Sequence, residues 1–367
     1  MELFPKLPTT TNEPGGTPAV SVITRTKNRA LFLRRCCQSI LDQKFQDWHH
    51  TIVNDGGNPK DVEEVVASFR EAYRGRVTVI HNPESLGMEK ASNVGIRASQ
   101  SPFVSLLDDD DTLHEDFLRE CHEYLTRSPQ GKRVAGVFTH TEVVQEEITA
   151  ANDIRVVDRK KFNQHYLTVS LFEMAMGNVF TNNAFLFRKS VWDALGGFNE
   201  ALPVCGDWEF NLRVLRKWEA GLIPKTLAYY HHRSTNVDHT SEYANTVIAA
   251  SDSHRYYRNL IRHQFLREDF ESGKVGLGHF LSSAYGFHYV ESSQKEFGRT
   301  YFDDTHLYLN DIHAKLDLIK GYTAQSVKTA QRQEAILDKA RRFFGAPAKG
   351  MARLLGAGRR PAELPST

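Results

Sequence analysis

Short β-branched runs alternate with helical patterns over residues 20–107, and this alternation constrains the fold more than any other feature of the sequence. The extended runs are Val20–Ile23, Thr51–Val53, Val77–Ile80 and Phe103–Leu107. Between them, helical patterns cover Ala30–Leu41, Val62–Phe69 and Lys90–Ala98. A strand, a helix and a second strand make a βαβ unit, in which the two strands are parallel. The sequence therefore predicts an α/β fold built on a doubly wound, mostly parallel sheet.

Three of the predicted strands end in polar segments, which are Thr24–Asn28, Asn54–Gly57 and Asp108–Asp111. Parallel strands place their carboxyl ends at the same edge of the sheet, and doubly wound sheets bind ligands in the crevice beyond that edge. We therefore expect the three segments to form one ligand site.

Four consecutive aspartates, Asp108–Asp111, directly follow the apolar run Phe103–Leu107. Neighbouring carboxylates repel and raise each other's pKa, so a cation is a natural partner. Carboxylate oxygens suit Mg²⁺ or Mn²⁺, and substrate phosphates commonly complete the shell of Mg²⁺. The run thus predicts a metal-assisted site for a nucleoside diphosphate. The alternative is a solvated acidic turn that caps a helix beginning near Glu115.

Composition narrows the class of protein. The chain has 367 residues, enough for one large α/β domain and an accessory segment. Its 46 lysines and arginines balance 45 aspartates and glutamates, so the chain has no strong net positive charge that would attract nucleic acid. The four cysteines show no CxxC spacing, which disfavours a zinc site or a disulfide framework. Because the sequence has no apolar stretch of signal-peptide or membrane-spanning length, we expect a cytoplasmic protein.

Five segments are expected along the chain. They are a disordered N-terminal tail (residues 1–18), the α/β domain (19–240), a helical accessory region (241–305), a long helix or short coiled coil (306–345) and a basic, disordered tail (346–367). In the fourth segment, Leu309, Ile312, Leu316 and Ile319 follow a three-four spacing, which is compatible with self-association through this helix.

Basic and apolar residues mix over Ala340–Arg360. Such a stretch is compatible with peripheral contact with an anionic bilayer, here the inner face of the cell membrane. A solvated tail is the alternative.

The segments Ser21–Arg29, Val53–Gly56 and Leu107–Asp111, in this order, resemble the signature of the family 2 glycosyltransferases. The resemblance covers about residues 19–235. It implies the GT-A fold, a Rossmann-like nucleotide-binding domain, here followed by a C-terminal helical region. It also implies inverting transfer from a nucleoside diphosphate sugar, with a UDP-sugar favoured, to a glycan or lipid-linked acceptor in surface polysaccharide assembly.

By the same resemblance, the first polar segment binds the nucleobase and ribose through Arg25, Thr26 and Asn28. Lys27 stands where most relatives have tyrosine, so this position lacks a ring that stacks on the base and offers a charge for a phosphate contact instead. Asp55 matches an aspartate that accepts a hydrogen bond from the base. A plain Asp-Gly turn is the alternative for Asp55.

A further stretch, Asn82–Gly95, resembles the part of the family that faces the donor. Lys90 would meet the diphosphate as a point charge. Asn93 either faces the donor or pins its helix to the neighbouring loop, since asparagine often bonds to backbone groups.

Within the aspartate run, the resemblance makes Asp110 the direct metal ligand and Asp111 a further candidate. Asp108 would lie near the ribose or in the second coordination shell of the metal. The alignment of the metal motif is ambiguous by one residue, because Asp109 fits a looser version of it, and Asp109 is a candidate donor-binding residue. His231 lies where some GT-A enzymes carry a histidine that completes the metal shell. A histidine ligand would favour Mn²⁺ over Mg²⁺.

The acceptor half of the family is resembled by Asn182–Trp192, Gly196–Glu200 and Gly206–Arg213. Asp207 matches the catalytic base, which takes a proton from the attacking hydroxyl, and Glu209 is the reserve base. Gly206 replaces a more usual acidic residue. The alternative for Asp207 is a helix N-cap.

Two other functions stay open from the sequence. A nucleotidyltransferase on a similar sheet would make the sugar nucleotide, but such enzymes favour a glycine-rich loop and Thr24–Asn28 contains no glycine. A catalytically silent sugar-nucleotide-binding scaffold is the second.

Overall fold

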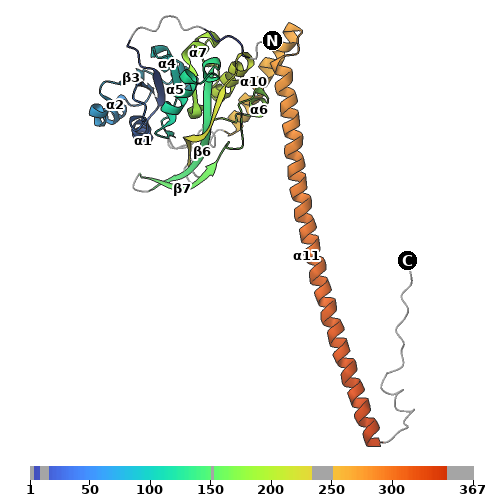
Figure 1. Cartoon of the computed structure of the whole chain (residues 1–367). Coiled ribbons are helices and arrows are strands. Elements are labelled where there is room, and N and C mark those ends of the chain that lie inside the picture. The colour runs from blue at the N-terminus through green and yellow to red at the C-terminus, as the bar shows by residue number, and fades with distance from the viewer. Residues whose placement is uncertain (1–3, 9–15, 150–152, 234–250, 345–367) are drawn as a thin grey trace. The chain divides into compact units, whose positions relative to one another are not determined.

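The computed structural model describes residues 4–8, 16–149, 153–233 and 251–344. The chain divides into two compact units, Met1–Tyr289 and Val290–Thr367. The first unit contains a nine-stranded sheet with helices on both faces (Figure 1).

The first half of the sheet is parallel. Its strands are β1 (Val20–Thr26), β2 (Trp48–Asp55), β3 (Val77–Asn82) and β4 (Phe103–Leu106), in the spatial order β3-β2-β1-β4. The connecting helices are α1 (Ala30–Leu41), α2 (Pro59–Ser68), α3 (Arg70–Tyr73) and α4 (Met88–Ala98). The predicted alternation is therefore confirmed, and most of the strands extend beyond their apolar runs.

The second half of the sheet mixes directions. It contains β5 (Thr112–Leu113), β6 (Gly136–Ile148), β7 (Ile154–Lys161), β8 (Phe185–Arg188) and β9 (Gly221–Arg233). Strand β8 is antiparallel to both β4 and β6, whereas β6 and β9 are parallel. Among the described strands, β7 pairs with β6 alone, and the two lie at the lower edge of the domain in Figure 1.

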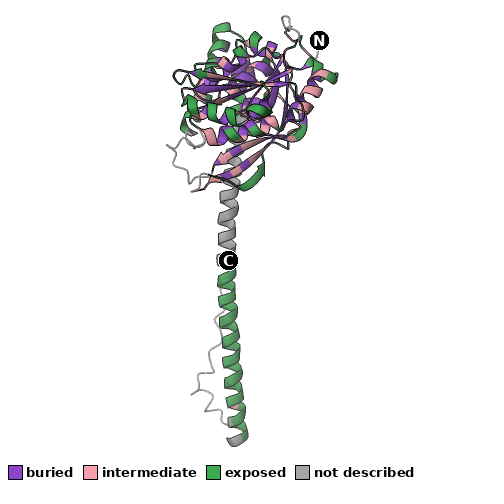
Figure 2. Cartoon of the chain, turned by 90° about the vertical axis from the view of Figure 1, so that its left-hand side faces the viewer, coloured by how far each residue is buried: buried purple, intermediate pink, exposed green. Residues whose placement is uncertain are grey.

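Two hydrophobic clusters hold the sheet and its helices together. One contains Phe138, Phe185 and Phe187 of the sheet with Trp208 and Phe210 of α8 (Gly206–Lys217). It also includes α6 (Leu171–Met176) and α7 (Lys189–Leu195). The other cluster packs α1 and α5 (Phe117–Arg127) against the sheet. Figure 2 shows the buried strands between the two layers. The helices thus cover both faces and leave the strand ends for a site.

Among the described residues, two helices follow the sheet: α10 (Ser251–Ser272) and α11 (Leu277–Phe344). Ile261 and Phe265 of α10 and Leu281 of α11 are buried in the same cluster as α8. Part of the predicted accessory region, in α10 and at the start of α11, therefore packs against the domain, while the predicted boundary at residue 240 lies outside the described residues.

The described side chains of α11 beyond residue 312 are almost all exposed (Figure 2). Leu316 is 45% and Ile319 59% exposed. Self-association through this helix stays a prediction, and the basic tail lies outside the described residues. Among the described helices, none has a stretch long and apolar enough to cross a membrane.

Part of the expected N-terminal tail is packed. Phe4 and Leu7 lie against the hydrophobic clusters, and the indole of Trp218 donates a hydrogen bond to the carbonyl of Lys6 at 3.0 Å. The expectation of disorder over residues 1–18 is therefore wrong for residues 4–8, because these apolar side chains find a surface that only the folded domain provides.

Candidate active site

The three polar segments meet at the carboxyl edge of β2, β1 and β4. In the β1–β2 pair, Thr26 lies opposite Asn54. Leu107, just before the aspartates, donates its backbone N–H to the carbonyl of Ile23 at 2.9 Å. The predicted convergence of the segments is confirmed.

Asp108 forms a two-point ion pair with Arg25 of β1. The Arg25 Nε donates to Oδ1 at 2.7 Å and Nη2 to Oδ2 at 3.2 Å. Arg25 Nη1 donates to Ser92 Oγ of α4 at 3.1 Å. The Asp108 side chain is 26% exposed, against 0% for Asp109 and 12% for Asp110. Asp108 and Arg25 therefore form the part of the acidic segment that a ligand reaches most easily.

Asp109 and Asp110 are held from inside the domain. Thr26 Oγ1 and Arg29 Nε donate to Asp109 Oδ2 at 2.6 and 3.1 Å. Arg29 Nη1 donates to Asp110 Oδ2 at 3.3 Å, and Arg233 of β9 donates to the same oxygen. Burial raises the pKa of Asp109 to about 6. Burial acts the same way on Asp110, but Arg29 and Arg233 outweigh it and hold its pKa below the ordinary value.

The three predicted metal ligands are not brought together. Asp111 turns toward β9, where its Oδ1 accepts the backbone N–H of His231 at 2.9 Å. The His231 ring bonds through Nδ1 to Glu146 at 2.9 Å and through Nε2 to Thr112 at 2.8 Å. Within the described ranges, no group of three or more His, Cys, Asp or Glu side chains forms a metal site. The expectation of a set made by Asp110, Asp111 and His231 is therefore wrong for this geometry, because protein groups engage both ring nitrogens.

The partner of His231 is a residue that no sequence motif marks. Glu146 of β6 is 0% exposed and accepts hydrogen bonds from Arg35 of α1 at 2.6 and 3.1 Å. Arg233 lies 3.7 Å from its Oε1. We call Glu146, Arg35, His231 and Arg233 the Glu146 network. It joins α1, β6 and β9 behind the aspartates, and Arg35 also donates to the carbonyl of Asp110. Sequence reasoning misses Glu146 because it lies within an unremarkable polar stretch.

Asp55 holds a loop. Its Oδ1 accepts hydrogen bonds from Asn82 Nδ2 at 2.9 Å and the backbone N–H of Leu86 at 2.8 Å. Its Oδ2 accepts from Ser85 Oγ at 2.8 Å and the N–H of Gly87 at 3.1 Å. A carboxylate offers about four acceptor positions. All four are used here, so the expected acceptance of a base N–H by Asp55 does not fit this geometry.

In the first polar segment, Thr24–Asn28, Asn28 bonds within the protein and Lys27 faces solvent. Asn28 adopts a positive φ of 56° and accepts the backbone N–H of Asn58 at 2.8 Å, which ties the loop to the start of α2. Lys27 is exposed, as is Lys90 on α4. Phosphate contacts by these two lysines stay predictions.

Asn93 is fully buried and pins α4 to the turn after α7. Its Nδ2 donates to the Phe198 carbonyl and to Glu200 Oε1, both at 2.9 Å. Its Oδ1 accepts from the Phe198 N–H at 3.0 Å and the Trp192 indole at 3.3 Å. Of the two roles that the sequence left open for Asn93, the geometry fits the pinning role, because every polar atom of the side chain is occupied.

Asp207 lies in the first turn of α8 and is partly exposed. Its Oδ2 accepts Asn178 Nδ2 at 2.7 Å, and its Oδ1 accepts the backbone N–H of Trp208 at 2.8 Å. Burial raises the pKa of Asp207, while Arg25 lowers it and Asp108 raises it. The structure therefore places Asp207 within electrostatic range of the Arg25–Asp108 pair.

Glu209 does not share that setting. It is 4% exposed, and Arg213 donates to its two oxygens at 2.7 and 2.8 Å. Arg213 continues to the carbonyls of Leu195 and Gly197. The reserve-base role of Glu209 does not fit, since its carboxylate is buried in an ion pair that braces the turn after α7.

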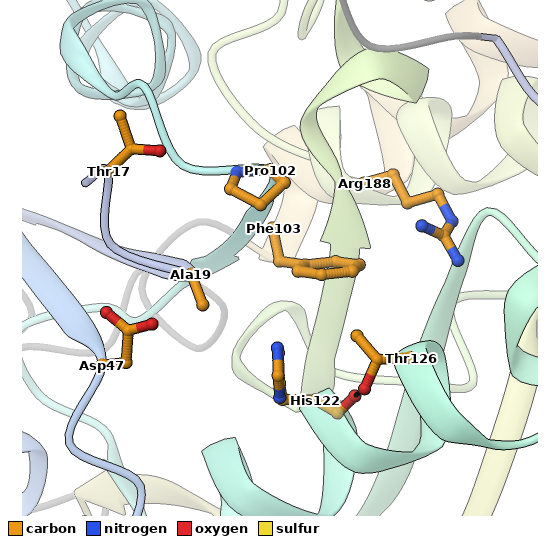
Figure 3. A pocket seen from close by; sticks show the side chains of 8 residues that line it. All are labelled: Thr17, Ala19, Asp47, Pro102, Phe103, His122, Thr126 and Arg188. Carbon is orange, nitrogen blue, oxygen red and sulfur yellow. Dashed lines mark hydrogen bonds between the residues drawn. The ribbon is translucent and has the colours of Figure 1, made fainter. Parts of the chain in front are cut away.

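A separate cavity of about 380 Å³ lies at the opposite, amino edge of the strands (Figure 3). Phe103 begins β4 there, and Arg188 lies over the Phe103 ring. Arg188 donates to the carbonyls of Val134, Leu125 and Gly131. Arg188 thus satisfies backbone carbonyls near the end of α5 and in the segment between α5 and β6. The cavity lies at the edge of the sheet opposite the aspartates.

Residues 21–192, which include every polar segment of the donor side, match the model of glycosyl transferase family 2. Over these residues the chain is similar to the family 2 glycosyltransferases. The putative glycosyltransferase EpsH of Bacillus subtilis is 25% identical over 222 residues, covering 59% of this chain and 61% of that protein. The chondroitin synthase of Pasteurella multocida is 25% identical over 226 residues, covering 61% of this chain and 21% of the relative. The alignments thus span less than two thirds of either relative.

A solved structure shares the fold of the glycosyltransferase domain. The crystal structure of S. aureus TarS residues 1-349 in complex with UDP-GlcNAc has a TM-score of 0.53 at 15% sequence identity. The match covers 74% of this chain and 72% of that one. The predicted GT-A architecture followed by C-terminal helices is therefore confirmed.

Proposed function

We propose that this chain transfers a sugar from a nucleoside diphosphate sugar to an acceptor hydroxyl, with inversion at the anomeric carbon and Asp207 as the general base. The observation that carries the proposal is the position of Asp207. It is a partly exposed carboxylate with a raised pKa, within electrostatic range of the Arg25–Asp108 pair at the carboxyl edge of the sheet.

On the donor side, the accessible pair offers both kinds of recognition group. Asp108 would accept hydrogen bonds from ribose hydroxyls, and Arg25 would set a positive charge next to the diphosphate. A UDP-sugar is the favoured donor, and the TarS complex with UDP-GlcNAc supports that choice. The buried Asp109 would support the loop through Thr26 and Arg29 instead of touching the donor.

On the acceptor side, Asp207 would take the proton of the attacking hydroxyl. The hydroxyl oxygen forms the new bond to the anomeric carbon as the bond to the diphosphate oxygen breaks, and the diphosphate leaves with the electron pair. Each oxygen of Asp207 accepts one hydrogen bond from the protein groups described above, so each keeps acceptor capacity for a hydroxyl. Desolvation makes the carboxylate a stronger base than it is in water.

The residues present fit a divalent metal through one carboxylate. Arg29 and Arg233 both donate to the same oxygen of Asp110, Oδ2, and the side chain keeps 12% of its surface exposed. One or two carboxylates together with substrate phosphates commonly hold Mg²⁺. Asp110 would hold Mg²⁺ or Mn²⁺ in this way. When bound, such an ion neutralises charge on the leaving diphosphate.

The acceptor would be a glycan or a lipid-linked glycan, in surface polysaccharide assembly. The names of the two relatives, a putative glycosyltransferase and a chondroitin synthase, support a glycan-building role. The family match does not favour a nucleotidyltransferase.

Two measurements test the proposal. A thermal-shift panel of UDP-, GDP-, TDP- and CMP-sugars, with and without Mn²⁺, identifies the donor, since a ligand that binds the folded state raises Tm. Asp207→Asn should then keep donor binding and lose transfer by about 10²-fold or more. Asp193→Asn is the matched control, because Asp193 is an exposed aspartate of α7 paired with Lys189. Wild-type transfer rates in Asp207→Asn would exclude this base, and donor binding without transfer in the wild type would favour a binding scaffold.

A further inference from the structure

A third carboxyl group lies between the donor-side pair and Asp207. Glu89, in the first turn of α4, is 4% exposed and its Oε2 lies 3.9 Å from Arg25 Nη1. Its carboxyl group also packs against the backbone of Gly206, the first residue of α8, and the Gly206 N–H favours its charged form. Glu89 therefore touches the guanidinium that pairs with Asp108 and the backbone that carries Asp207.

Gly206 leaves the space that Glu89 occupies. A Cβ atom at position 206 would lie 2.2 Å from Glu89 Cδ and 2.5 Å from Oε1. Such distances are far inside van der Waals contact. Gly206 does not have a positive φ, so its backbone conformation does not by itself require a glycine. Glycine at 206 thus permits the close approach of this carboxyl group to the start of α8.

The loop before α4 fixes where Glu89 lies. Asp55 binds the backbone N–H groups of Leu86 and Gly87, and Gly87 is the residue before the first turn of α4. At the next turn, Ser92 accepts from Arg25. The four hydrogen bonds of Asp55 therefore set the start of the helix that carries Glu89.

The charges that face Glu89 come from three elements besides its own. Arg25 of β1 attracts its negative charge, while Asp207 of α8 and Asp108 after β4 repel it. Its carboxyl group also acts on the thiol of Cys205, just before α8. Burial raises the pKa of Glu89 to about 7, with Arg25 opposing and the two aspartates adding to the shift.

We propose that Glu89 is a positioning residue for sugar transfer, which anchors the turn of Asp207 through Gly206 and sets how much positive charge Arg25 offers to the donor diphosphate. The inference rests on the proposed function. The ionised form of Glu89 offsets Arg25 together with Asp108, whereas the protonated form leaves Asp108 as the remaining counter-charge and more positive potential for the anionic donor.

Two variants separate the anchor from the charge. Glu89→Gln keeps the size of the side chain and an oxygen that can face the Gly206 backbone, but it carries no charge. Wild-type affinity for UDP-GlcNAc should fall about 10-fold from pH 6 to pH 8, whereas Glu89→Gln should keep the pH 6 value throughout. Glu89→Ala loses the anchor, so kcat should fall on the order of 10-fold while donor affinity still shows no step near pH 7. UDP-GlcNAc suits this test because its diphosphate diester does not titrate in this range.

Unfolding of the ligand-free protein provides a readout that needs neither donor nor transfer. A group whose pKa is raised in the folded state stabilises the fold at low pH, and that contribution is lost as the pH rises through the folded value. The Tm of the wild type should therefore fall relative to that of Glu89→Gln between pH 5 and pH 8. The exposed Glu71→Gln on α3 is the matched control and should track the wild type.

The outcomes are distinct. A constant Tm difference between wild type and Glu89→Gln across this range overturns the role of Glu89, whether or not a donor binds. The same pH dependence of donor affinity in both proteins overturns it as well. A pH-dependent Tm difference in a protein that binds no sugar nucleotide contradicts the proposed function instead.

Discussion

Replacing Asp55 by asparagine should destabilise the protein much more than it weakens donor binding. The change keeps the size of the side chain and turns one acceptor oxygen into an NH₂ donor. With the NH₂ at the Oδ2 position, the Ser85 hydroxyl can rotate to accept, but the Gly87 N–H then faces another donor. The opposite orientation sets the NH₂ against both Asn82 and Leu86, which is worse.

The expected magnitude follows from these contacts. A hydrogen bond to a charged group contributes about 1.5–3 kcal/mol, and Asp55→Asn loses one such bond and weakens three. Asp55 is 7% exposed, so water replaces little of the loss. We expect a loss of about 3 kcal/mol, which for a unit of this size lowers Tm by roughly 6–12 °C.

Thermal unfolding and calorimetric titration of UDP-GlcNAc measure the two effects in the same protein, at a temperature where the variant is folded. Asp252→Asn, an aspartate 90% exposed on α10, is the control. The reasoning is refuted by an Asp55→Asn protein whose Tm is unchanged and whose donor affinity falls 10-fold or more, since that result means direct recognition of the base.

Four further outcomes are expected. Asn93→Ala should lower the free energy of unfolding by about 2–4 kcal/mol in a denaturant titration without changing donor affinity, because it orphans the buried backbone groups of Phe198. Glu146→Gln should destabilise the fold by about 3 kcal/mol, because it leaves the arginines of the Glu146 network without their buried counter-charge; an unchanged Tm would contradict this. Gly206→Ala should lower kcat and stability, and the stability loss should be smaller in a Glu89→Ala background, which a double-mutant cycle measures. Mn²⁺ should raise Tm more with UDP-GlcNAc than alone, and chelation should remove the difference, since the protein supplies few ligands of its own.

The amino-acid sequence by itself determines the parallel half of the fold and the edge where the chemistry gathers. Both depend on short-range information. The β-branched runs and helical spacing between Val20 and Leu107 are local, and chain connectivity forces parallel strands to end at one edge. The order of three strand-end segments is enough to indicate the family.

Local pattern does not account for the mixed half of the sheet. It does not predict strand β7, because the side chains of this strand are nearly all exposed, five of the eight are charged, and they lack the alternation that marks a half-buried strand. The segment is a strand because β6 provides backbone hydrogen-bond partners for it, and this pairing forms only in the tertiary structure.

The tertiary structure alone decides which polar side chains face a ligand and which hold the protein together. In sequence, Asp55, Asn93 and His231 have the same chemistry as ligand-binding residues. In the fold, donors and acceptors from distant segments saturate all three. Conversely, nothing in its helix distinguishes Glu89, which gains its setting only where α8 approaches it at Gly206. The physical reason is that a carboxylate or an imidazole has a fixed number of hydrogen-bonding positions, and only the packed fold determines which groups fill them.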